Sequence, residues 1–563
     1  MKLAVLLFAA LPFAALAAPP IAPDPAVDRL LDQIFTQEQR FVDSLRAHTP
    51  LFETYIQESP SAEAAPDALP SKDHYFLGRV RVSESVGYEP LIERATVEPD
   101  IKTNRLSPLR SKAKIQPMTF LPRGFAQMSI LDLNGFSRTN YRLEYVRREF
   151  LGDVRALVFD VIPVRQEPGR FLGRIWVEER NHAIVRFNGT YLPAPIPKNT
   201  PPEMYFHFDS WRTNAAVDQW IPAHIYVEEE RPTTTAGVTT RFKAQTRIWD
   251  YAAAPVNKLD ELTQILIEDA SEVKDQTVSR DVSPLESQRA WERQAEENVL
   301  ARLEKGGLLA PPGPVDEVLN TVVNNLIITG KLSVDARCRV LLTTPLETFS
   351  IGHTIVISRG LIDVLPDETS LALVLAAELS HIALAHRTPT QFAFNNQTML
   401  SDAELLARLR FERTPRELDE AGQKTIEIMR ASPYQKTGNA GLFLKALASR
   451  SAALPRLLAA NLGNQLANEK ALQRLEEFTA AAPDLEEGKL DQIAALPLGS
   501  RIKLNPWSDQ ITLIETKPVS LLSAREKMPF EVAPFVPYLT FAAVPATVTP
   551  AAIPVSPPSP LQP

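Results

Sequence analysis

Short runs of β-branched and aromatic residues, separated by turn residues, fill the chain between about His74 and Tyr251. The clearest runs are 142–150, 155–161, 171–178, 183–188, 225–230 and 239–249. Runs of this length and composition are typical of strands joined by turns. The segment 74–251 is therefore predicted to form an antiparallel β domain.

Helical patterns lie on both sides of this domain. Apolar residues recur at three- and four-residue spacing over 24–59, which predicts an amphipathic helix, and a Pro- and Ala-rich linker follows to about Ser71. The helical pattern returns over 284–480, where a pair of strands is also expected at 339–343 and 354–358. Helices are expected over 286–303, 315–328, 367–386, 402–410, 416–431, 441–448 and within 454–480. The predicted fold class is α+β with several domains.

The C-terminal part differs in composition from the rest. A short β segment is expected within 498–540, over 501–520. Residues 541–563 hold 7 prolines and no charged residue, so they are predicted to form a disordered, Pro-rich tail.

Charge and cysteine content exclude several classes of function. With 60 basic and 68 acidic residues the net charge is -8, which argues against a nucleic-acid partner. Cys338 is the only cysteine, so neither an intramolecular disulfide nor a cysteine zinc cluster can form. No GxSxG motif or Cys-His pair supports nucleophilic hydrolysis.

The first residues are typical of an export signal. Lys2 is followed by an uncharged apolar run over 3–16 and by the small-residue site Ala15-Leu16-Ala17. Cleavage is expected after Ala17, and no cysteine follows that would carry a lipid anchor. No other run of about 18 apolar residues occurs, so the mature chain is predicted to be exported, periplasmic or secreted, without a transmembrane span.

The pentad Ala377-Glu378-Leu379-Ser380-His381 is the segment most indicative of chemistry. In an HExxH zinc site, two histidines four residues apart share one helix face, and the Glu activates the metal-bound water. Here Ala377 stands where the first histidine would be.

The run from Thr354 to His386 resembles the HtpX and CAAX-prenyl-endopeptidase family of gluzincin zinc metallopeptidases, over about 315–447. The resemblance implies a mainly α metallopeptidase-like domain over 284–480. Its second motif helix, ExxAD, corresponds to Leu418-Asp419-Glu420-Ala421-Gly422. Carried over by position, Glu378 is the general base and His381 a zinc ligand, whereas Ala377 and Leu418 occupy the other two ligand positions.

Alanine and leucine have no lone pair for zinc, and a catalytic site needs three protein ligands. The resemblance therefore predicts no zinc cofactor and an inactive, decayed enzyme.

Other residues could rebuild the metal site. Glu417 adjoins Leu418, although helical neighbours diverge by about 100°. His386 follows His381 by five residues, about 140° around the helix axis, so it is expected to point elsewhere, and His353 precedes the second strand. Alternatively, Glu378 and His381 are buried structural residues, with Glu378 paired to Arg359 or His381.

The β domain carries a second resemblance. The segment 169–192, which contains GRFLGRIWVEE and follows GDVRALVFDVIPV, resembles the LolA-type half-barrels that carry lipoproteins or lipids in the bacterial periplasm. The resemblance implies an apolar cavity between the curved sheet and a helix. Residues available to line it are Phe171, Trp176, Phe187 and Trp249. An ordinary packed β domain is the alternative.

The sequence thus predicts an exported, peptidase-like protein that acts by binding envelope proteins, lipoproteins or lipid. Two alternatives are an active zinc metalloendopeptidase with replacement ligands and a periplasmic lipid or lipoprotein carrier. Bound zinc distinguishes the first alternative, and co-purifying lipid distinguishes the second.

Overall fold

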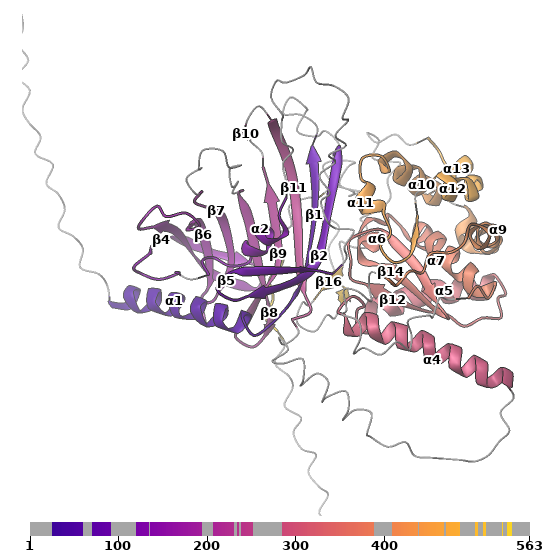
Figure 1. Ribbon diagram of the computed structural model, residues 1–563, viewed down its shortest axis with the longest axis horizontal. Helices are drawn as coiled ribbons and strands as arrows, with labels where there is room; N and C mark the ends of the chain where they lie inside the picture. Colours follow the sequence, from indigo (N-terminus) through magenta and orange to yellow (C-terminus); the bar gives the residue numbers. More distant parts are fainter. Residues whose placement is uncertain are drawn as a thin grey trace, which may run out of the picture.

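The computed structural model contains one large antiparallel sheet and one mainly helical unit (Figure 1). It describes residues 25–59, 70–91, 120–133, 135–193, 206–229, 233–235, 238–251, 284–387, 408–436, 439–466, 469–484, 502–504, 511–513, 532 and 537–542. The predicted export signal (1–17) and most of the linker before Ser71 lie outside these residues. We call residues 25–251 the sheet unit and residues 284–484 the helical unit.

The N-terminal helix is shorter than the sequence pattern indicated. Helix α1 is Pro25–Leu45, and strand β1 is Leu51–Ser59, so the prediction of one helix over 24–59 was wrong. Pro50 separates the two elements, and proline cannot continue a helical hydrogen-bond ladder. Strand β1 pairs on both sides, with β2 and with β11, which holds 51–59 extended.

The sheet follows the order β3-β2-β1-β11-β9-β8-β7-β6-β5-β4, and β10 pairs with β11. Its further strands are β2 (Lys72–Val82), β3 (Val86–Pro90), β4 (Tyr141–Leu151), β5 (Val154–Pro163), β6 (Phe171–Glu178), β7 (Ile184–Tyr191), β8 (Phe208–Ala216), β9 (Gln219–Glu228), β10 (Thr233–Thr235) and β11 (Val238–Trp249). The predicted antiparallel β domain is confirmed, although it begins earlier, at β1. Among the described strands, β3 and β4 do not pair, so the sheet is open.

The two faces of the sheet have different covers. Helix α1 and the short helix α2 (Pro122–Gln127) pack on the face that we call inner, which carries an aromatic core including Phe171, Phe187 and Phe208. Trp176 and Trp211 lie in a separate cluster on the opposite, outer face. The predicted cavity lining is therefore wrong, because Phe171 and Trp176 lie on opposite faces of β6.

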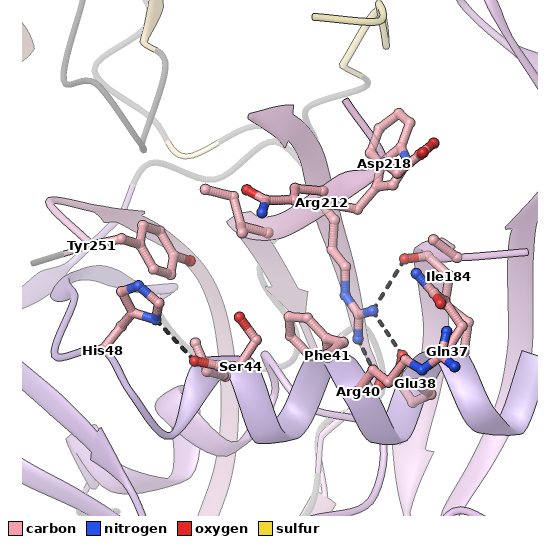
Figure 2. A pocket seen from close by; sticks show the side chains of 15 residues that line it. Gln37, Glu38, Arg40, Phe41, Ser44, His48, Ile184, Arg212, Asp218 and Tyr251 are labelled. Atoms are coloured by element: carbon pink, nitrogen blue, oxygen red, sulfur yellow. Dashed lines mark hydrogen bonds and ion pairs between the residues drawn. The ribbon is translucent and has the colours of Figure 1, made fainter. Parts of the chain in front are cut away.

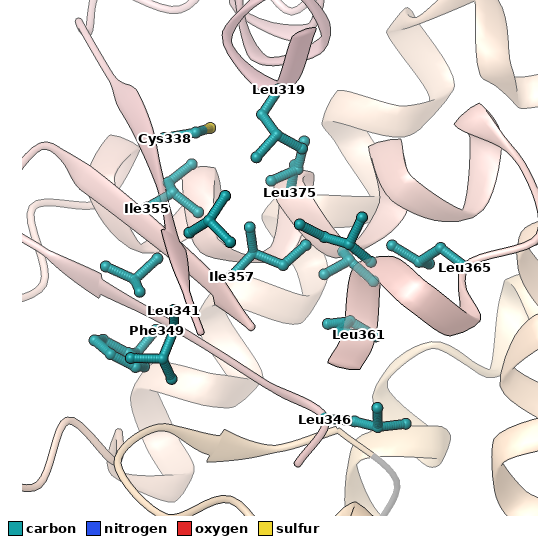
Figure 3. Close-up of a cluster of buried hydrophobic side chains, with 14 of the residues drawn as sticks. Leu319, Cys338, Leu341, Leu346, Phe349, Ile355, Ile357, Leu361, Leu365 and Leu375 are labelled. Carbon is teal, nitrogen blue, oxygen red and sulfur yellow. The ribbon is translucent and has the colours of Figure 1, made fainter. Parts of the chain in front are cut away.

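The helical unit is built on a small sheet of order β12-β14-β13-β15. Its strands are β12 (Arg337–Leu341), β13 (Glu347–Ile351), β14 (Thr354–Ser358) and β15 (Asn464–Gln465). Its helices are α4 (Pro284–Lys305), α5 (Pro314–Thr329), α6 (Arg359–Val364), α7 (Glu368–Ala383), α9 (Pro415–Ala431), the 3-10 helix Pro433–Lys436, α10 (Asn439–Arg450), α11 (Pro455–Leu458), α12 (Glu469–Arg474) and α13 (Glu476–Ala481). Figure 3 shows its buried side chains gathered between the strands and α5, α6 and α7.

Most of the predicted helices of this unit are confirmed, but the helix predicted within 454–480 is divided into several short elements. That stretch consists of α11, α12 and α13 with strand β15 between them. A Cβ at Gly463 would lie 2.4 Å from the backbone oxygen of Thr348, so the chain there runs directly against β13 as a strand partner. Most of the helix predicted over 402–410 lies outside the described residues.

The two units share one hydrophobic core. Leu51, Tyr55, Leu77 and Trp249 from the outer face belong to the same buried cluster as the interior of the helical unit. Trp249 donates a 2.7 Å hydrogen bond from Nε1 to the backbone oxygen of Gly307. Trp249, predicted to line a cavity, therefore lies at the interface between the units.

Two C-terminal pieces complete the described structure. Strands β16 (Ile502–Leu504) and β17 (Ile511–Leu513) form a two-stranded sheet, as the expected short β segment requires. Residues 537–542, the C-terminal segment, pack on the outer face, with Leu539 buried. The predicted tail over 541–563 is thus wrong for Phe541 and Ala542, and its remainder lies outside the described residues.

Within the described residues, no helix is both long enough and apolar enough to cross a membrane.

Candidate functional site

A pocket of about 200 Å³ lies between α1 and one end of strands β7, β8 and β9. Its walls combine apolar side chains with polar ones, and Arg212 of β8 forms part of them. Figure 2 shows Arg212 reaching from the sheet down to α1, with His48 and Tyr251 on the other side. The pocket thus marks the place where the helix meets the end of the sheet.

A buried ion pair joins α1 to the sheet beside this pocket. Glu38 and Arg212 form two 2.7 Å contacts, from Nη1 to Oε2 and from Nη2 to Oε1, and both side chains are only 1% exposed. Nη1 also donates to the backbone oxygen of Ile184, at 3.2 Å. The guanidinium carbon lies 3.7 Å from the ring centroid of Phe41, which adds a cation–π contact. Removing either charge would leave the other buried and unpaired.

The opposite side of the pocket is aromatic. The Tyr251 hydroxyl donates to the backbone oxygen of Pro222, and burial raises the pKa of Tyr251 well above its usual range. His48 lies at the end of α1, with Nδ1 2.9 Å from the backbone oxygen of Ser44 and its ring edge-on to Tyr251. This wall presents aromatic surface to any bound group.

The rest of the inner face is filled by its own side chains. Phe171 packs edge-to-face on Phe187, at a centroid distance of 5.7 Å, and Phe187 on Phe208 at 5.8 Å. Ile34, Phe35, Val42 and Leu45 of α1 close this core from above. In the described structure α1 therefore covers the surface predicted to hold an apolar ligand.

Glu378, the predicted general base, lies on α7 and is 3% exposed. Its Oε1 accepts a 2.8 Å hydrogen bond from the Thr348 hydroxyl of β13. Burial raises the pKa of Glu378, an effect opposed by Thr348 and Arg413. Arg359, an expected partner, instead lies at the unit interface near Asp363.

His381, the predicted ligand, is also buried, and its Nδ1 lies 2.8 Å from Nδ1 of His386. The expectation that His386 points elsewhere is wrong, because α7 ends at Ala383 and a turn with Ala385 at φ 54° folds the chain back. Nε2 of His386 then lies 3.3 Å from Oε2 of Glu420. Burial, followed by the charge of Arg413 and by His386, lowers the pKa of His381 to about 3.

Arg413 brings a permanent positive charge to this cluster. Its side chain is 7% exposed, and Nη2 donates to the Ser350 hydroxyl at 2.9 Å and to the Ser350 backbone oxygen at 3.1 Å. The Arg413 backbone N–H donates to Oδ1 of Asn464, which fixes the residue against β15. Sequence reasoning missed Arg413, since it lies in no motif and its partners are distant along the chain.

The remaining predicted ligands do not converge. Glu417 caps α9 by accepting from the backbone and hydroxyl of Thr414; these bonds lower its pKa, although partial burial raises it. His353 lies in the turn between β13 and β14, with Nδ1 2.7 Å from the backbone oxygen of Asp335. Ala377 and Leu418 are both partly buried.

Among the described side chains, no group of three His, Cys, Asp or Glu is placed to hold a metal. These residues do not fit zinc, because a guanidinium already supplies the positive charge beside Glu378 and His381. The absence of bound zinc itself stays a prediction.

No family model matches the chain, and no curated protein matches it. Thirteen chains of solved structures are similar to part of it, and two of them are described here. A LolA-superfamily protein from Nitrosomonas europaea is 14% identical over 41% of this chain and 96% of that chain, with a TM-score of 0.21. A chain of the Pseudomonas aeruginosa MucA/MucB complex is 11% identical over 40% and 96%, with a TM-score of 0.12. At such TM-scores neither likeness carries an argument.

Proposed function

We propose that this chain is an exported binding protein that accepts the acyl chain of a lipid or lipoprotein on the inner face of its sheet. The observation that carries the proposal is an aromatic-rich inner face covered by one amphipathic helix, α1, with a pocket at its edge. In the ligand-bound form, α1 moves aside and the acyl chain takes the place of its apolar side chains.

The energies of the two forms are close enough for exchange. Helix α1 buries four apolar side chains, Ile34, Phe35, Val42 and Leu45. At roughly 1.5–3 kcal/mol for each buried side chain, their contribution is matched by an acyl chain of about twelve carbons, at ~0.8 kcal/mol per methylene. Displacement of α1 by a lipid is therefore feasible without unfolding the sheet.

The Glu38–Arg212 pair gives this movement a defined closed state. Inside the closed form the two charges satisfy each other at 2.7 Å. When α1 moves away, water solvates both charges, so neither Glu38 nor Arg212 is left buried without its partner. This ion pair favours one defined position of α1 on the apolar surface over shifted positions along it.

The helical unit is assigned a supporting role in this proposal. In this unit Glu378 accepts from Thr348, His381 contacts His386, and Arg413 donates to Ser350. Its core is continuous with the outer face of β1, β2 and β11, which stiffens the sheet opposite the proposed ligand. Peptidase activity is not part of the proposal.

The test is acyl binding by the full mature chain. We expect mass spectrometry of a solvent extract to detect co-purified acyl lipid, and a fluorescent acyl probe to bind the delipidated protein. Ile34→Asp together with Val42→Asp removes the apolar seat of α1 and should increase probe binding several-fold, because the inner face becomes accessible. Thr36→Asp, on the exposed face of the same helix, is the matched control. Absence of extracted lipid together with absence of probe binding in all three proteins would overturn the proposal.

A further inference from the structure

Strand β4 forms one end of the large sheet, away from the helical unit (Figure 1). It pairs with β5 along one edge, and none of the described strands pairs with its other edge. The backbone N–H and C=O groups of an unpaired edge can bind a strand of another chain. This edge of β4 is therefore a candidate interaction surface.

Three large apolar side chains of β4 are exposed. Tyr145 is 59% exposed, Val146 36% and Phe150 69%. The Tyr145 ring packs edge-on against Phe159 of β5 at a centroid distance of 5.8 Å, so the apolar inner face continues to the last strand of the sheet. Apolar side chains gathered on one exposed element are typical of a surface that a partner covers.

A β-bulge changes the face on which the charged residues of β4 lie. The pairing with β5 shifts by one residue between Tyr145 and Arg147. Before the shift, Glu144 stands between Leu143 and Tyr145, which face the inner core, so its side chain is on the outer face. After the shift, Arg147 lies opposite Val158 of the outer cluster. The bulge therefore places Glu144 and Arg147 on the same face, where strict alternation would separate them.

Four charged side chains consequently line the outer face of β4 with alternating sign. In chain order they are Arg142, Glu144, Arg147 and Glu149. Nε of Arg142 lies 2.9 Å from Oε1 of Glu144, and Nη2 of Arg147 lies 2.6 Å from Oε2 of Glu149. Trp176 Nε1 donates to Oε2 of Glu149 at 3.2 Å, which holds this carboxylate on the outer face. The signs read plus, minus, plus, minus in one direction and the exact complement in the other.

We propose that β4 pairs antiparallel with β4 of a second copy of this chain, about a two-fold axis at the bulge. In this register Arg142 lies opposite Glu149 of the second copy. Glu144 likewise lies opposite Arg147 of the second copy, and symmetry repeats both pairs. A shift of two residues in one direction places Arg142 opposite Arg147, and a shift in the other direction places Glu144 opposite Glu149. Because like charges directly opposite each other destabilise a strand pair, the charges select a single register.

The same register covers the exposed apolar side chains. Tyr145 lies opposite Val146 of the second copy, and Phe150 lies opposite Tyr141. Since a two-fold pairing uses the same edge of both copies, the assembly closes at two. Charges and a bulge normally keep an edge strand from pairing with other chains. On β4 they disfavour unrelated strands but are complementary to a second copy, so they supply specificity while backbone hydrogen bonds and apolar contacts supply most of the affinity.

Charge reversal at the central pair tests the proposal. Sedimentation of the full mature chain at low ionic strength, over a series of concentrations, should show a monomer–dimer equilibrium. Glu144→Arg alone or Arg147→Glu alone places like charges opposite each other at both symmetric positions, and should raise the dissociation constant about tenfold or more. Glu144→Arg with Arg147→Glu restores opposite charges and should dimerise as the wild type does.

Mixing the two single variants gives a sharper measurement. In a mixed dimer, Arg at position 144 of one copy lies opposite Glu at position 147 of the other, and the remaining pairs also have opposite signs. Two proteins that are largely monomeric alone should therefore dimerise when combined. Glu477→Arg, a reversal in the exposed Arg430–Glu477 pair of the helical unit, is the matched control and should leave the wild-type equilibrium unchanged.

The outcomes decide the proposal without reference to acyl binding. A wild type that stays monomeric, alone or with an unrelated co-purified chain, overturns it. A dimer of equal stability in the wild type and both single variants also overturns it, because the interface then lies elsewhere. If circular dichroism shows either single variant unfolded, Arg142→Glu and Glu149→Arg, which form the other proposed pair, replace them in the same measurements.

Discussion

Arg413 is the residue that most changes the interpretation of the sequence motif. A metal site holds its cation through lone pairs, whereas Arg413 contributes the positive charge covalently and binds Ser350 through its own donors. Glu378 and His381 are therefore buried on one helix, with a hydroxyl, an imidazole and the charge of a guanidinium beside them. They are integral to the core, and their titration becomes a property of folding stability.

We expect His381 to make the protein less stable as the pH falls. Because its folded pKa of about 3 lies below the ordinary 6.5, the unfolded chain binds the proton first, and stability falls as the pH drops below about 6.5, until both states are protonated below pH 3. Between pH 6.5 and 5 this contribution is about 2 kcal/mol. Urea unfolding at these two values should show a smaller loss for His381→Gln than for the wild type.

The control for this measurement is His207→Gln, a change at an exposed histidine. Its loss of stability between the two pH values should equal that of the wild type. Equal losses in the wild type and in His381→Gln would contradict the buried, neutral state of His381.

The functional residues show why the site was only partly predictable. Helical spacing placed Glu378 and His381 correctly on one apolar helix, because periodicity is a local property. Arg212 and Glu38 are separated by 174 positions, and nothing near either one marks it as a partner. Their juxtaposition depends on the register of the whole sheet, which local patterns do not contain.

Elements differed in predictability for a related reason. Strands such as β6 and β14 have clear β-branched runs bounded by turns, and their predicted bounds agree with the structure. Strand β1 was mistaken for helix because its apolar residues continue the spacing of α1 across Pro50. The C-terminal segment adjoins a Pro-rich stretch, and its contacts with the outer face are all distant in sequence.

The C-terminal segment fits against the turn between β4 and β5. The Asp153 N–H donates to the Leu539 backbone oxygen at 2.8 Å, and Arg180 stacks on Phe541 at 4.4 Å. A Cβ at Gly152 would lie 2.6 Å from the Leu539 backbone, and Gly152 also has a positive φ of +69°. Both the close contact and the backbone conformation therefore favour glycine at this position. The C-terminal segment is thus packed against the sheet as part of the folded structure.

We expect Leu539→Asp to detach this segment. The substitution places a charge among Trp176, Trp211 and Trp220, at a cost of about 2–4 kcal/mol. Loss of stability in urea and a red shift of tryptophan emission would report the exposed outer face. Tyr538→Ser is the control, because Tyr538 is 64% exposed and the change removes only an exposed hydrogen bond to Asp153, at a cost of about 1 kcal/mol or less. Identical emission from both variants would show that the segment is not bound.

The interface between the units combines a shared core with buried carboxylates. Asp73 accepts the backbone N–H groups of Arg456 and Leu457, at 2.9 and 2.7 Å, and Glu53 accepts from the backbone and hydroxyl of Thr344 at 2.6 and 2.7 Å. Each carboxylate belongs to the sheet unit and each donor to the helical unit. The two units are therefore expected to unfold together.

We expect Glu53→Gln with Asp73→Asn to separate this single transition into two. The amides weaken four hydrogen bonds to backbone or hydroxyl donors, each worth about 1.5–3 kcal/mol when the acceptor is charged. Calorimetry should show one peak for the wild type and two for the variant. Glu477→Gln, which breaks the exposed Arg430–Glu477 pair, should retain one peak. Two peaks in the wild type would contradict coupled unfolding.

The pairing of β1 with β11 sets an order of events during synthesis. Ser59 faces Arg241 in the finished sheet, so one edge of β1 has no partner until the chain has been made beyond β11. At about 5–20 residues per second, that interval is roughly 10–40 s. An unpaired strand edge can capture strands of other chains. Strand β11 contributes to both the inner face and the unit interface. A delay in synthesis between β1 and β11 therefore leaves both of these cores incomplete for the same interval.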